Sequence, residues 1–221
     1  MNKGTLVAER NARAPNAGRD PEAEITLGLL NAVEENSAVT QRSIAGELGI
    51  ALGLANAYLK RCVKKGFIKV SQVPANRYAY YLTPKGFAEK SRLTAEYLAS
   101  SFGFFRDARH QCTEVFVECA RRGWTRVALA GTGDLGEIAT LCALDTPVTL
   151  AGFVDGEAGA RKFAGLPVAA SLSGLGAVDA VLVTDLKRPQ ETYDAIAAEM
   201  DPARVLAPPM LNVTRKRGGE G

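Results

Sequence analysis

The hydrophobic positions near the start of the chain repeat with the period of a helix. Asp20 and Pro21 form a helix-start signal, and apolar residues at four-residue spacing then predict a helix over about 21–35. These apolar residues are Ile25, Leu29 and Val33. We therefore expect a buried stripe along one face of this helix.

Two further helical segments, TQRSIAGELG and ALGLANAYLKRCVKKG, follow with very little chain between them. Thr40 caps the first segment, and Gly49 and Gly66 are the terminators expected just past the two helix ends. The apolar residues available for packing are Ile44, Leu48, Leu52, Leu59 and Val63. Two helices joined this closely predict a helix-turn-helix.

The segments FIKVSQV and RYAYYL are rich in strand-forming residues and are separated by Pro74, Ala75 and Asn76. They predict a basic two-stranded hairpin, which would form a wing. Thr83 and Pro84 then start another helix, because a hydroxyl caps well and proline suits the first helical turn.

The stretch from 84 to 122 has helical composition, with an interruption expected near Gly103. It carries more apolar surface than one isolated helix can hide, from Phe102, Phe104, Phe105, Val115, Phe116 and Val117. A homodimer would cover this surface and would place two recognition helices on successive turns of a palindromic DNA site. Packing against the second half of the chain is the competing explanation.

Strand and helix patterns alternate in the second half. The helix after the strand RVALA is expected to pack Leu135, Ile138 and Leu141. The later segments VTLAGFVD, LPVAAS, AVDAVLVTD and RVLAP, with the helix PQETYDAIAAEM, complete a five-stranded parallel sheet of Rossmann type. The fold class is α/β overall, with an N-terminal winged helix-turn-helix domain followed by this small Rossmann-type domain.

Length and composition agree with two domains, since 221 residues exceed the common single-domain size of about 100–150. The expected parts are a disordered tail (1–20), a winged helix-turn-helix domain (21–100), a linker or dimerisation helix (101–123), a Rossmann-like domain (124–212) and a second tail (213–221). No run of about 18 uncharged apolar residues occurs, which argues against a membrane span. The first twenty residues lack the apolar stretch of a signal peptide, so we expect a cytoplasmic protein.

The net charge of +3 hides an asymmetry between the halves. Residues 1–122 hold 18 Lys and Arg against 12 Asp and Glu, whereas residues 123–221 hold 9 against 12. Within residues 60–92 there are nine basic side chains and one acid, Glu89. This excess indicates a polyanion-binding surface, and a solvated lysine-rich face is the alternative.

The segments TQRSIAGELG, ALGLANAYLKRCVKKGFIKV and YYLTPKGFAEK resemble the winged-helix domain of MarR-type transcriptional regulators, over about residues 22–100. This resemblance implies double-stranded DNA as the partner, and association with a protein is the alternative. In such a domain the second helix of the pair enters the major groove. The candidate contacts are Asn56 to an adenine, Lys60, Arg61 and Lys64 to phosphates or a guanine, Arg77 to the minor groove, and Arg42 and Ser43 to the DNA backbone.

The opening of the predicted recognition helix, ALGLA, departs from the family because it lacks the usual polar side chains. We therefore expect sparse hydrogen bonding to bases and a larger part for thymine methyl contacts.

The strand RVALA runs directly into a GxGxxG loop formed by Gly131, Thr132, Gly133 and Gly136. Such a loop presents helix N–H groups to a pyrophosphate, and Asp155, 22 residues after Gly133, would accept the ribose hydroxyls. Asp134 places a negative charge at the mouth of this loop, which Lys187 or Arg188 would compensate.

The stretch from GTGDLG through GFVDG and AVLVTD to VLAPPML resembles the nicotinamide-binding domain of the redox-sensing repressor Rex and its CoA-binding-domain relatives, over about 124–211. This implies a metabolite-controlled repressor that binds NAD(H) or another nucleotide. A nucleotide sugar or a CoA ester as the ligand, a vestigial site, and glycines that only shape the turn stay open.

The sequence offers little support for catalysis or metal binding. The second half has no histidine, so we do not expect an enzyme, although a small nucleotide-dependent oxidoreductase is the rival interpretation. The four cysteines show no CxxC spacing, which makes a structural zinc site improbable. Cys112 and Cys119 share a helical face and suggest either an oxidation switch or, as the favoured reading, buried thiols.

Overall fold

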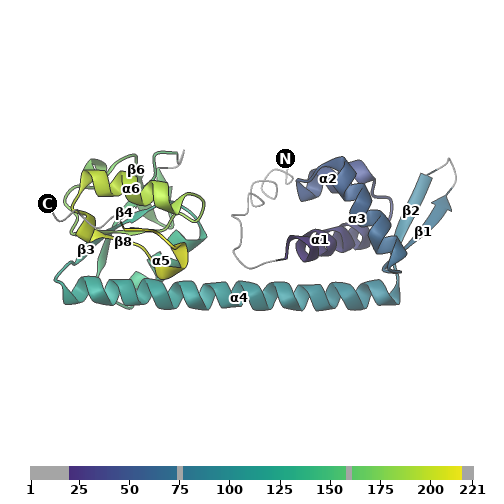
Figure 1. Cartoon of the computed structure of the whole chain (residues 1–221), viewed down its shortest axis with the longest axis horizontal. Coiled ribbons are helices and arrows are strands. Elements are labelled where there is room, and N and C mark those ends of the chain that lie inside the picture. The colour runs from purple at the N-terminus through teal and green to yellow at the C-terminus, as the bar shows by residue number, and fades with distance from the viewer. Residues whose placement is uncertain (1–19, 74–76, 158–160, 216–221) are drawn as a thin grey trace. The chain divides into compact units, whose positions relative to one another are not determined.

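The computed structural model of the chain describes residues 20–73, 77–157 and 161–215 (Figure 1). The described residues divide into two compact units, with the boundary between Phe102 and Gly103.

The N-terminal unit begins with three helices, as the sequence predicts. Helix α1 (Pro21–Glu35) is capped by Asp20, whose carboxylate accepts a hydrogen bond from the Glu22 N–H. Helix α2 (Gln41–Leu48) starts with a capping box between Thr40 and Ser43 and ends at Gly49, which has a φ of 63°. Helix α3 (Leu52–Lys64) follows after a three-residue turn.

These helices enclose a core that includes Leu29, Leu30, Ile44, Leu59 and Ile68. Leu52, expected to pack in this core, is instead 47% exposed, because it is the first residue of α3 and precedes the buried part of the helix face that Ala55, Leu59 and Cys62 form.

Strands β1 (Ile68–Val73) and β2 (Arg77–Leu82) pair antiparallel, with Ile68 opposite Leu82, and confirm the predicted wing. Helix α4 (Pro84–Arg121) follows. The predicted interruption near Gly103 is wrong, since α4 is one helix across this position. A single glycine costs a helix only about 1 kcal/mol, which a helix of 38 residues tolerates.

The C-terminal unit contains a six-stranded sheet of mostly parallel strands (Figure 1). Its strands are β3 (Arg126–Ala130), β4 (Thr149–Val154), β5 (Lys162–Phe163), β6 (Leu166–Ala169), β7 (Ala180–Val183) and β8 (Val205–Leu206). Their order is β5-β6-β4-β3-β7-β8, and every pair except β5-β6 is parallel.

The five expected strands are therefore present, and the sequence interpretation missed β5. Strand β5 forms a hairpin with β6 through Ala164 and Gly165, which both have positive φ values, of 46° and 80°. Two positive φ values in a two-residue loop are typical of the turn that joins antiparallel strands.

Helices α5 (Asp134–Ala143) and α6 (Pro189–Glu199) and the short 3-10 helices η2 (Leu172–Leu175), η3 (Pro202–Arg204) and η4 (Pro209–Leu211) complete this unit. Leu135 and Ile138 of α5 are buried as predicted, whereas Leu141 is 55% exposed.

The last part of α4 belongs to the core of the C-terminal unit. Ala108, Cys112, Phe116 and Cys119 are fully buried in that core. For Phe116 the competing explanation, packing against the second half of the chain, is thus correct. Phe102 and Val117 stay more than half exposed. Within the described residues, no helix is long and apolar enough to cross a membrane.

Candidate nucleic-acid interface and glycine-rich loop

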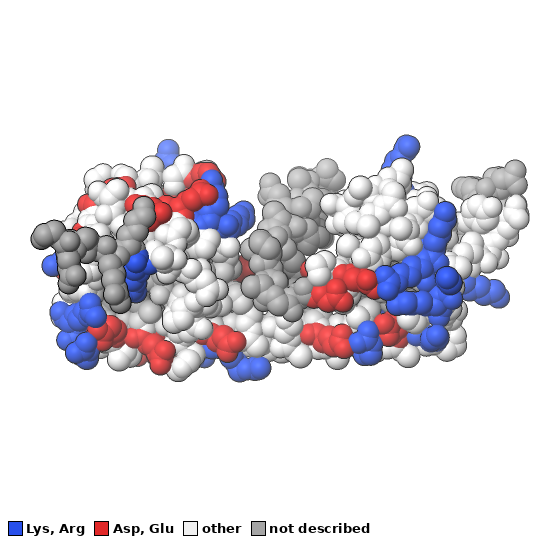
Figure 2. All heavy atoms as spheres, viewed as in Figure 1, with Lys and Arg blue, Asp and Glu red and all other residues white. Residues whose placement is uncertain are grey.

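The outward face of α3 carries a row of basic side chains. Lys60 and Lys64 are exposed one helical turn apart, and Lys65 and Lys69 continue the row toward and along β1. Figure 2 shows Lys and Arg side chains gathered over this part of the N-terminal unit. Within the described residues, no acidic side chain forms an ion pair with Lys60 or Lys64. Their ammonium groups are therefore available to an anionic partner.

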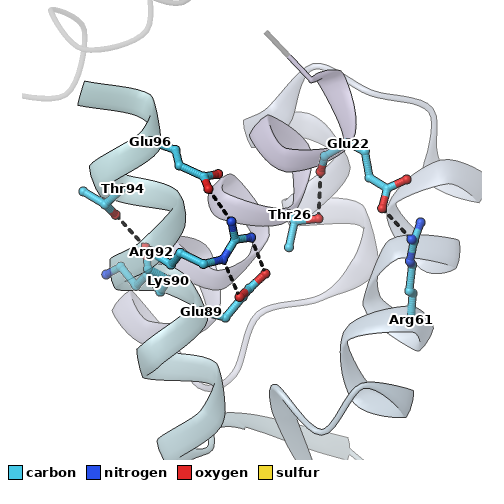
Figure 3. Close-up of polar contacts among 8 residues, drawn as sticks. All are labelled: Glu22, Thr26, Arg61, Glu89, Lys90, Arg92, Thr94 and Glu96. Atoms are coloured by element: carbon cyan, nitrogen blue, oxygen red, sulfur yellow. Dashed lines mark hydrogen bonds and ion pairs between the residues drawn. The ribbon is translucent and has the colours of Figure 1, made fainter. Parts of the chain in front are cut away.

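Arg61 differs from these lysines because it already has an anionic partner. Its guanidinium lies 2.5 Å from a carboxylate oxygen of Glu22, on the first turn of α1 (Figure 3). Both side chains are nearly half exposed, so solvent screens the pair. The predicted phosphate contact of Arg61 requires that this ion pair open.

Two other basic residues of the 60–92 stretch are also paired with acids. Arg92 forms two hydrogen bonds to Glu89, at 2.8 and 2.9 Å, and one to Glu96, at 2.5 Å (Figure 3). The Arg92 guanidinium lowers the pKa of Glu89 below its usual value. Lys90 contacts the Glu34 carboxylate. The basic residues of this stretch without an ion pair among the described residues are therefore Lys60, Lys64, Lys65, Lys69 and Lys85, which lie on α3, just after it, on β1 and at the start of α4.

Asn56 does not present the amide edge expected of an adenine contact. The side chain is half-buried, and its Oδ1 is buried without a hydrogen-bond partner among the described residues. Two-point recognition of adenine uses both the oxygen and the nitrogen of the amide. The predicted adenine contact of Asn56 therefore requires its side chain to rotate so that both atoms face the DNA.

Arg42 and Ser43 lie exposed on the first turn of α2. The Ser43 hydroxyl donates to the carbonyl oxygen of Thr40 at 2.9 Å and accepts from the Thr40 N–H at 2.9 Å, so it serves first as a cap. Arg42 has no such local role. Arg77 starts β2, and its side chain lies outside the described part of the structure.

The glycine-rich loop between β3 and α5 uses its three glycines differently. A Cβ atom on Gly131 would lie 2.7 Å from the Cβ of Asp185, and one on Gly136 would lie 2.7 Å from the Phe153 ring. At Gly133, with a φ of 151°, a Cβ atom would meet nothing within 4 Å. Gly131 and Gly136 therefore permit close packing, whereas Gly133 leaves open space in front of the N-terminus of α5.

Asp155, the predicted ribose ligand, already accepts hydrogen bonds from this loop. Its Oδ2 accepts from the backbone N–H of Thr132 at 3.0 Å and from the Thr132 hydroxyl at 2.5 Å. Its Oδ1 accepts from the Glu157 N–H at 3.0 Å. The carboxylate therefore joins the end of β4 to the loop, and binding a ribose would require it to exchange these partners.

Arg188 pairs with Glu157 rather than compensating Asp134. The guanidinium lies 2.5 Å from the Glu157 carboxylate and 3.9 Å from that of Glu191. It lowers the pKa of Glu157 below the usual glutamate value. Lys187 is exposed, and no acid within the described residues forms an ion pair with it. The two cations proposed from the sequence thus differ, because a ligand that uses Arg188 must first open its ion pair with Glu157.

Asp185 is a residue that the sequence interpretation missed. It follows β7, and its Oδ1 accepts the backbone N–H groups of Lys187, at 2.7 Å, and Arg188, at 3.1 Å. The Thr192 hydroxyl donates to its other oxygen at 2.8 Å. An aspartate shortly before the Pro189 helix start was the available signal. Asp185 fixes the loop that faces Gly131.

A pocket of about 190 Å³ lies between α1 and the first half of α4. Leu27, Leu93 and Tyr97 give it an apolar lining, and Asp20, Glu24 and Glu96 give it acidic groups. These carboxylates would repel an anionic ligand, so the pocket does not suit a nucleotide. Nothing in the spacing of these residues along the chain predicted it.

The cysteines are buried thiols. Burial raises the pKa of Cys112 to about 12 and that of Cys119 to about 11. Both residues are fully buried, in agreement with the favoured interpretation of plain buried thiols over an oxidation switch. In the described part of the chain, no three His, Cys, Asp or Glu side chains gather in a way that could hold a metal ion.

Comparisons with known proteins match the N-terminal unit. Residues 22–69 match the family of winged helix-turn-helix DNA-binding domains. Among solved structures, the chain is similar to the transcriptional regulator SlyA, with 26% sequence identity and a TM-score of 0.32 over 35% of this chain and 55% of that chain. The chain thus spans about half the length of SlyA.

A second similar structure is the transcriptional regulator PcaV from Streptomyces coelicolor, with 22% identity and a TM-score of 0.35 over 44% of this chain and 74% of that chain. PcaV in complex with its natural ligand has 22% identity and a TM-score of 0.34, over 44% and 70% of the two chains. The comparison with curated proteins finds no match. The helix order, the wing and the family match agree that the N-terminal unit is a winged helix-turn-helix domain.

Proposed function

We propose that this chain is a DNA-binding transcriptional regulator of MarR type, in which the winged helix binds duplex DNA. The observation that carries the proposal is the row of exposed lysines on α3, with Lys60 and Lys64 free of ion pairs within the described residues. In a helix-turn-helix the second helix enters the major groove, and cations on that helix neutralise phosphates. The role is one of binding and regulation, without a catalysed reaction.

The salt dependence of DNA binding tests this proposal. Each neutralised phosphate adds about 0.9 to the slope of log affinity against log salt concentration. The double variant Lys60→Ala/Lys64→Ala should therefore lower the slope by about 2, measured by fluorescence anisotropy on a labelled duplex. The control Lys162→Ala/Lys187→Ala removes the same charge from the C-terminal unit and should leave the slope unchanged. Equal slopes for all three proteins would contradict the proposal.

We further propose that the C-terminal unit is a Rossmann-type domain that holds a nucleotide effector such as NAD(H). In chain order, the parallel strands lie as third, second, first, fourth and fifth across the sheet. That is the order of a dinucleotide-binding fold, whose ligand lies at the carboxyl end of the first strand. The open space at Gly133 occurs at that point. A nucleotide sugar or a CoA ester would use the same phosphate site.

Calorimetry with NAD, NADH, a CoA ester and a nucleotide sugar tests the effector. A ligand regulates DNA binding only if it binds the free protein and the DNA-bound protein with different affinities. The difference between its two binding free energies equals the change that it causes in the free energy of DNA binding. We expect one of these compounds to bind and to shift the anisotropy curve. If none binds, the nucleotide role fails while the DNA-binding role remains.

We also propose a homodimer. Leu98 and Phe102 are 45% and 58% exposed on successive turns of α4. Exposed apolar side chains at this spacing are typical of a helix that packs on a partner helix. Light scattering of the purified protein should give twice the mass of 23.4 kDa, and Phe102→Ser should weaken the association. A monomer at all concentrations would contradict this proposal.

A further inference from the structure

The first two turns of α3 present hydrocarbon to solvent. Leu52 is 47% exposed and Leu54 is 41% exposed, and the small residues Gly53 and Ala57 lie exposed beside them. Leu52 opens the helix in line with the buried residues Ala55 and Leu59, whereas Leu54 lies on the other flank, on the same side of the helix as the exposed Ala57 and Arg61. Because these buried residues already anchor α3 in its core, packing within the unit does not explain the two exposed leucines.

The two polar side chains of the same turns, Asn56 and Tyr58, are half-buried. Asn56 has a buried amide oxygen, and Tyr58 is half-buried against the core of the unit. The next exposed polar groups on the helix are Lys60 and Arg61. The exposed residues between Leu52 and Leu59 are Leu52, Gly53, Leu54 and Ala57, and none of them carries a polar side-chain atom.

The charges and the chemistry of this face indicate which molecule binds it. Gly53, Ala57, Lys60 and Lys64 are exposed and follow one another at helical spacing along one face of α3. A polyanion that binds the lysines therefore lies over Gly53 and Ala57, with Leu52 and Leu54 at the two edges of the contact. In the major groove of DNA, most base-edge atoms are hydrogen-bond donors and acceptors, and the thymine C5-methyl group is the apolar feature. An apolar helix face matches that methyl group.

We propose that the first two turns of α3 recognise thymine methyl groups in the major groove, with Leu52 and Leu54 as the residues that determine specificity. This inference rests on the proposed DNA-binding function. Lys60 and Lys64 hold phosphates and set the register, and the leucines bury methyl groups. Gly53, where a Cβ atom would meet nothing within 4 Å, and Ala57 leave the backbone free to approach the base edges.

Uracil provides a sharp test, because it keeps every hydrogen-bonding group of thymine and lacks only the methyl group. A preferred duplex is first selected in vitro from a random DNA library with the full-length protein. Its affinity is then compared with that of copies in which single thymines are replaced by uracil. We expect about a fourfold loss for each methyl group that becomes buried, and recovery with 5-bromouracil, whose bromine fills the same volume.

Variants assign the effect to α3. For Leu54→Ala, replacing a thymine that Leu54 contacts by uracil should leave the DNA affinity almost unchanged, in place of the roughly fourfold loss expected for the original protein. The control Leu144→Ala shortens a leucine that is 78% exposed in the C-terminal unit, and it should retain the full loss. Replacing Leu54 by alanine, a better helix former, keeps the helix intact.

The outcomes separate the inference from the function on which it rests. A selected duplex whose uracil copies bind the unchanged protein equally well would overturn methyl recognition while leaving DNA binding in place. A selection that yields no preferred duplex, together with a salt slope near zero, would overturn DNA binding itself and favour a protein as the partner of the leucines.

Discussion

Arg61 of α3 and Glu22 of α1 form an ion pair at 2.5 Å, so the helix proposed to bind DNA is tied to the first helix of the unit through one of its own cations (Figure 3). The backbone carbonyl of Glu22 also accepts a hydrogen bond from the Thr26 hydroxyl at 2.7 Å. A phosphate that binds Arg61 must therefore compete with a carboxylate already in place.

Removing the charge of Glu22 should strengthen DNA binding. In Glu22→Gln the Arg61 guanidinium is released, and we expect affinity at low salt to rise several-fold and the salt slope to increase by about 1. Anisotropy titrations at several salt concentrations measure both quantities. The control Glu35→Gln makes the same change of net charge at the other end of α1, and it should raise affinity less. If the two variants behave alike, Arg61 has no direct phosphate contact.

Much of the N-terminal unit was predictable because its signals are local. Thr40 caps α2 and Gly49 ends it, and each acts through backbone geometry within four residues of its position. The wing and the start of α4 were predictable for the same reason. The continuity of α4 through Gly103 was not, because a single glycine only weakly disfavours a helix and its local signal was given too much weight.

The site residues were harder to predict than the elements that carry them. Asn56 lies on the expected helix, yet rotation about the helix axis buries its amide oxygen. Arg61 and Asp155 have the expected positions, but their charges are engaged by Glu22 and Thr132. Such partners come from elements distant in the sequence, and composition and spacing do not record them.

Gly86 should tolerate no side chain. A Cβ atom there would lie 2.0 Å from the backbone carbonyl oxygen of Phe67, where the wing meets the first turn of α4. Relieving this overlap requires the backbone to move, so Gly86→Ala should destabilise the N-terminal unit by about 1–3 kcal/mol. Urea denaturation followed by circular dichroism measures this loss. The fluorescence of Trp124, the single tryptophan, reports on the C-terminal unit and should change much less.

The matched substitution Gly103→Ala should stabilise the protein, in contrast to Gly86→Ala. A Cβ atom at Gly103 would meet nothing within 4 Å, and alanine favours a helix over glycine by about 1 kcal/mol. We expect the midpoint of urea denaturation to rise. A lower urea midpoint for Gly103→Ala would indicate that α4 is bent at Gly103 in the folded protein and is not continuous there.

The thiols should be inert while the protein is folded. Burial raises the pKa of Cys62 and Cys119 to about 11 and that of Cys112 to about 12, so at pH 8 the thiolate fraction is on the order of one in a thousand or less. A thiol-reactive disulfide reagent should modify the four cysteines only after denaturation. Mild peroxide should leave DNA affinity unchanged. Rapid modification of the folded protein would restore the oxidation switch as a hypothesis.

The contact between Thr132 and Asp155 should matter both for stability and for any ligand at the glycine-rich loop. Thr132→Val removes the hydroxyl that donates to Asp155 at 2.5 Å and should cost about 1–3 kcal/mol, because it removes a hydrogen bond to a charged group. Thr132→Ser keeps the hydroxyl and should stay within about 0.5 kcal/mol of the original protein. Thermal unfolding followed by Trp124 fluorescence compares the two variants.

A nucleotide that uses Asp155 for its ribose must displace the Thr132 hydroxyl from this carboxylate. Thr132→Val should therefore bind that nucleotide as tightly as the original protein or more tightly, whereas Asp155→Ala should abolish binding. If Asp155→Ala retains full affinity in calorimetry, the carboxylate serves only to hold the loop.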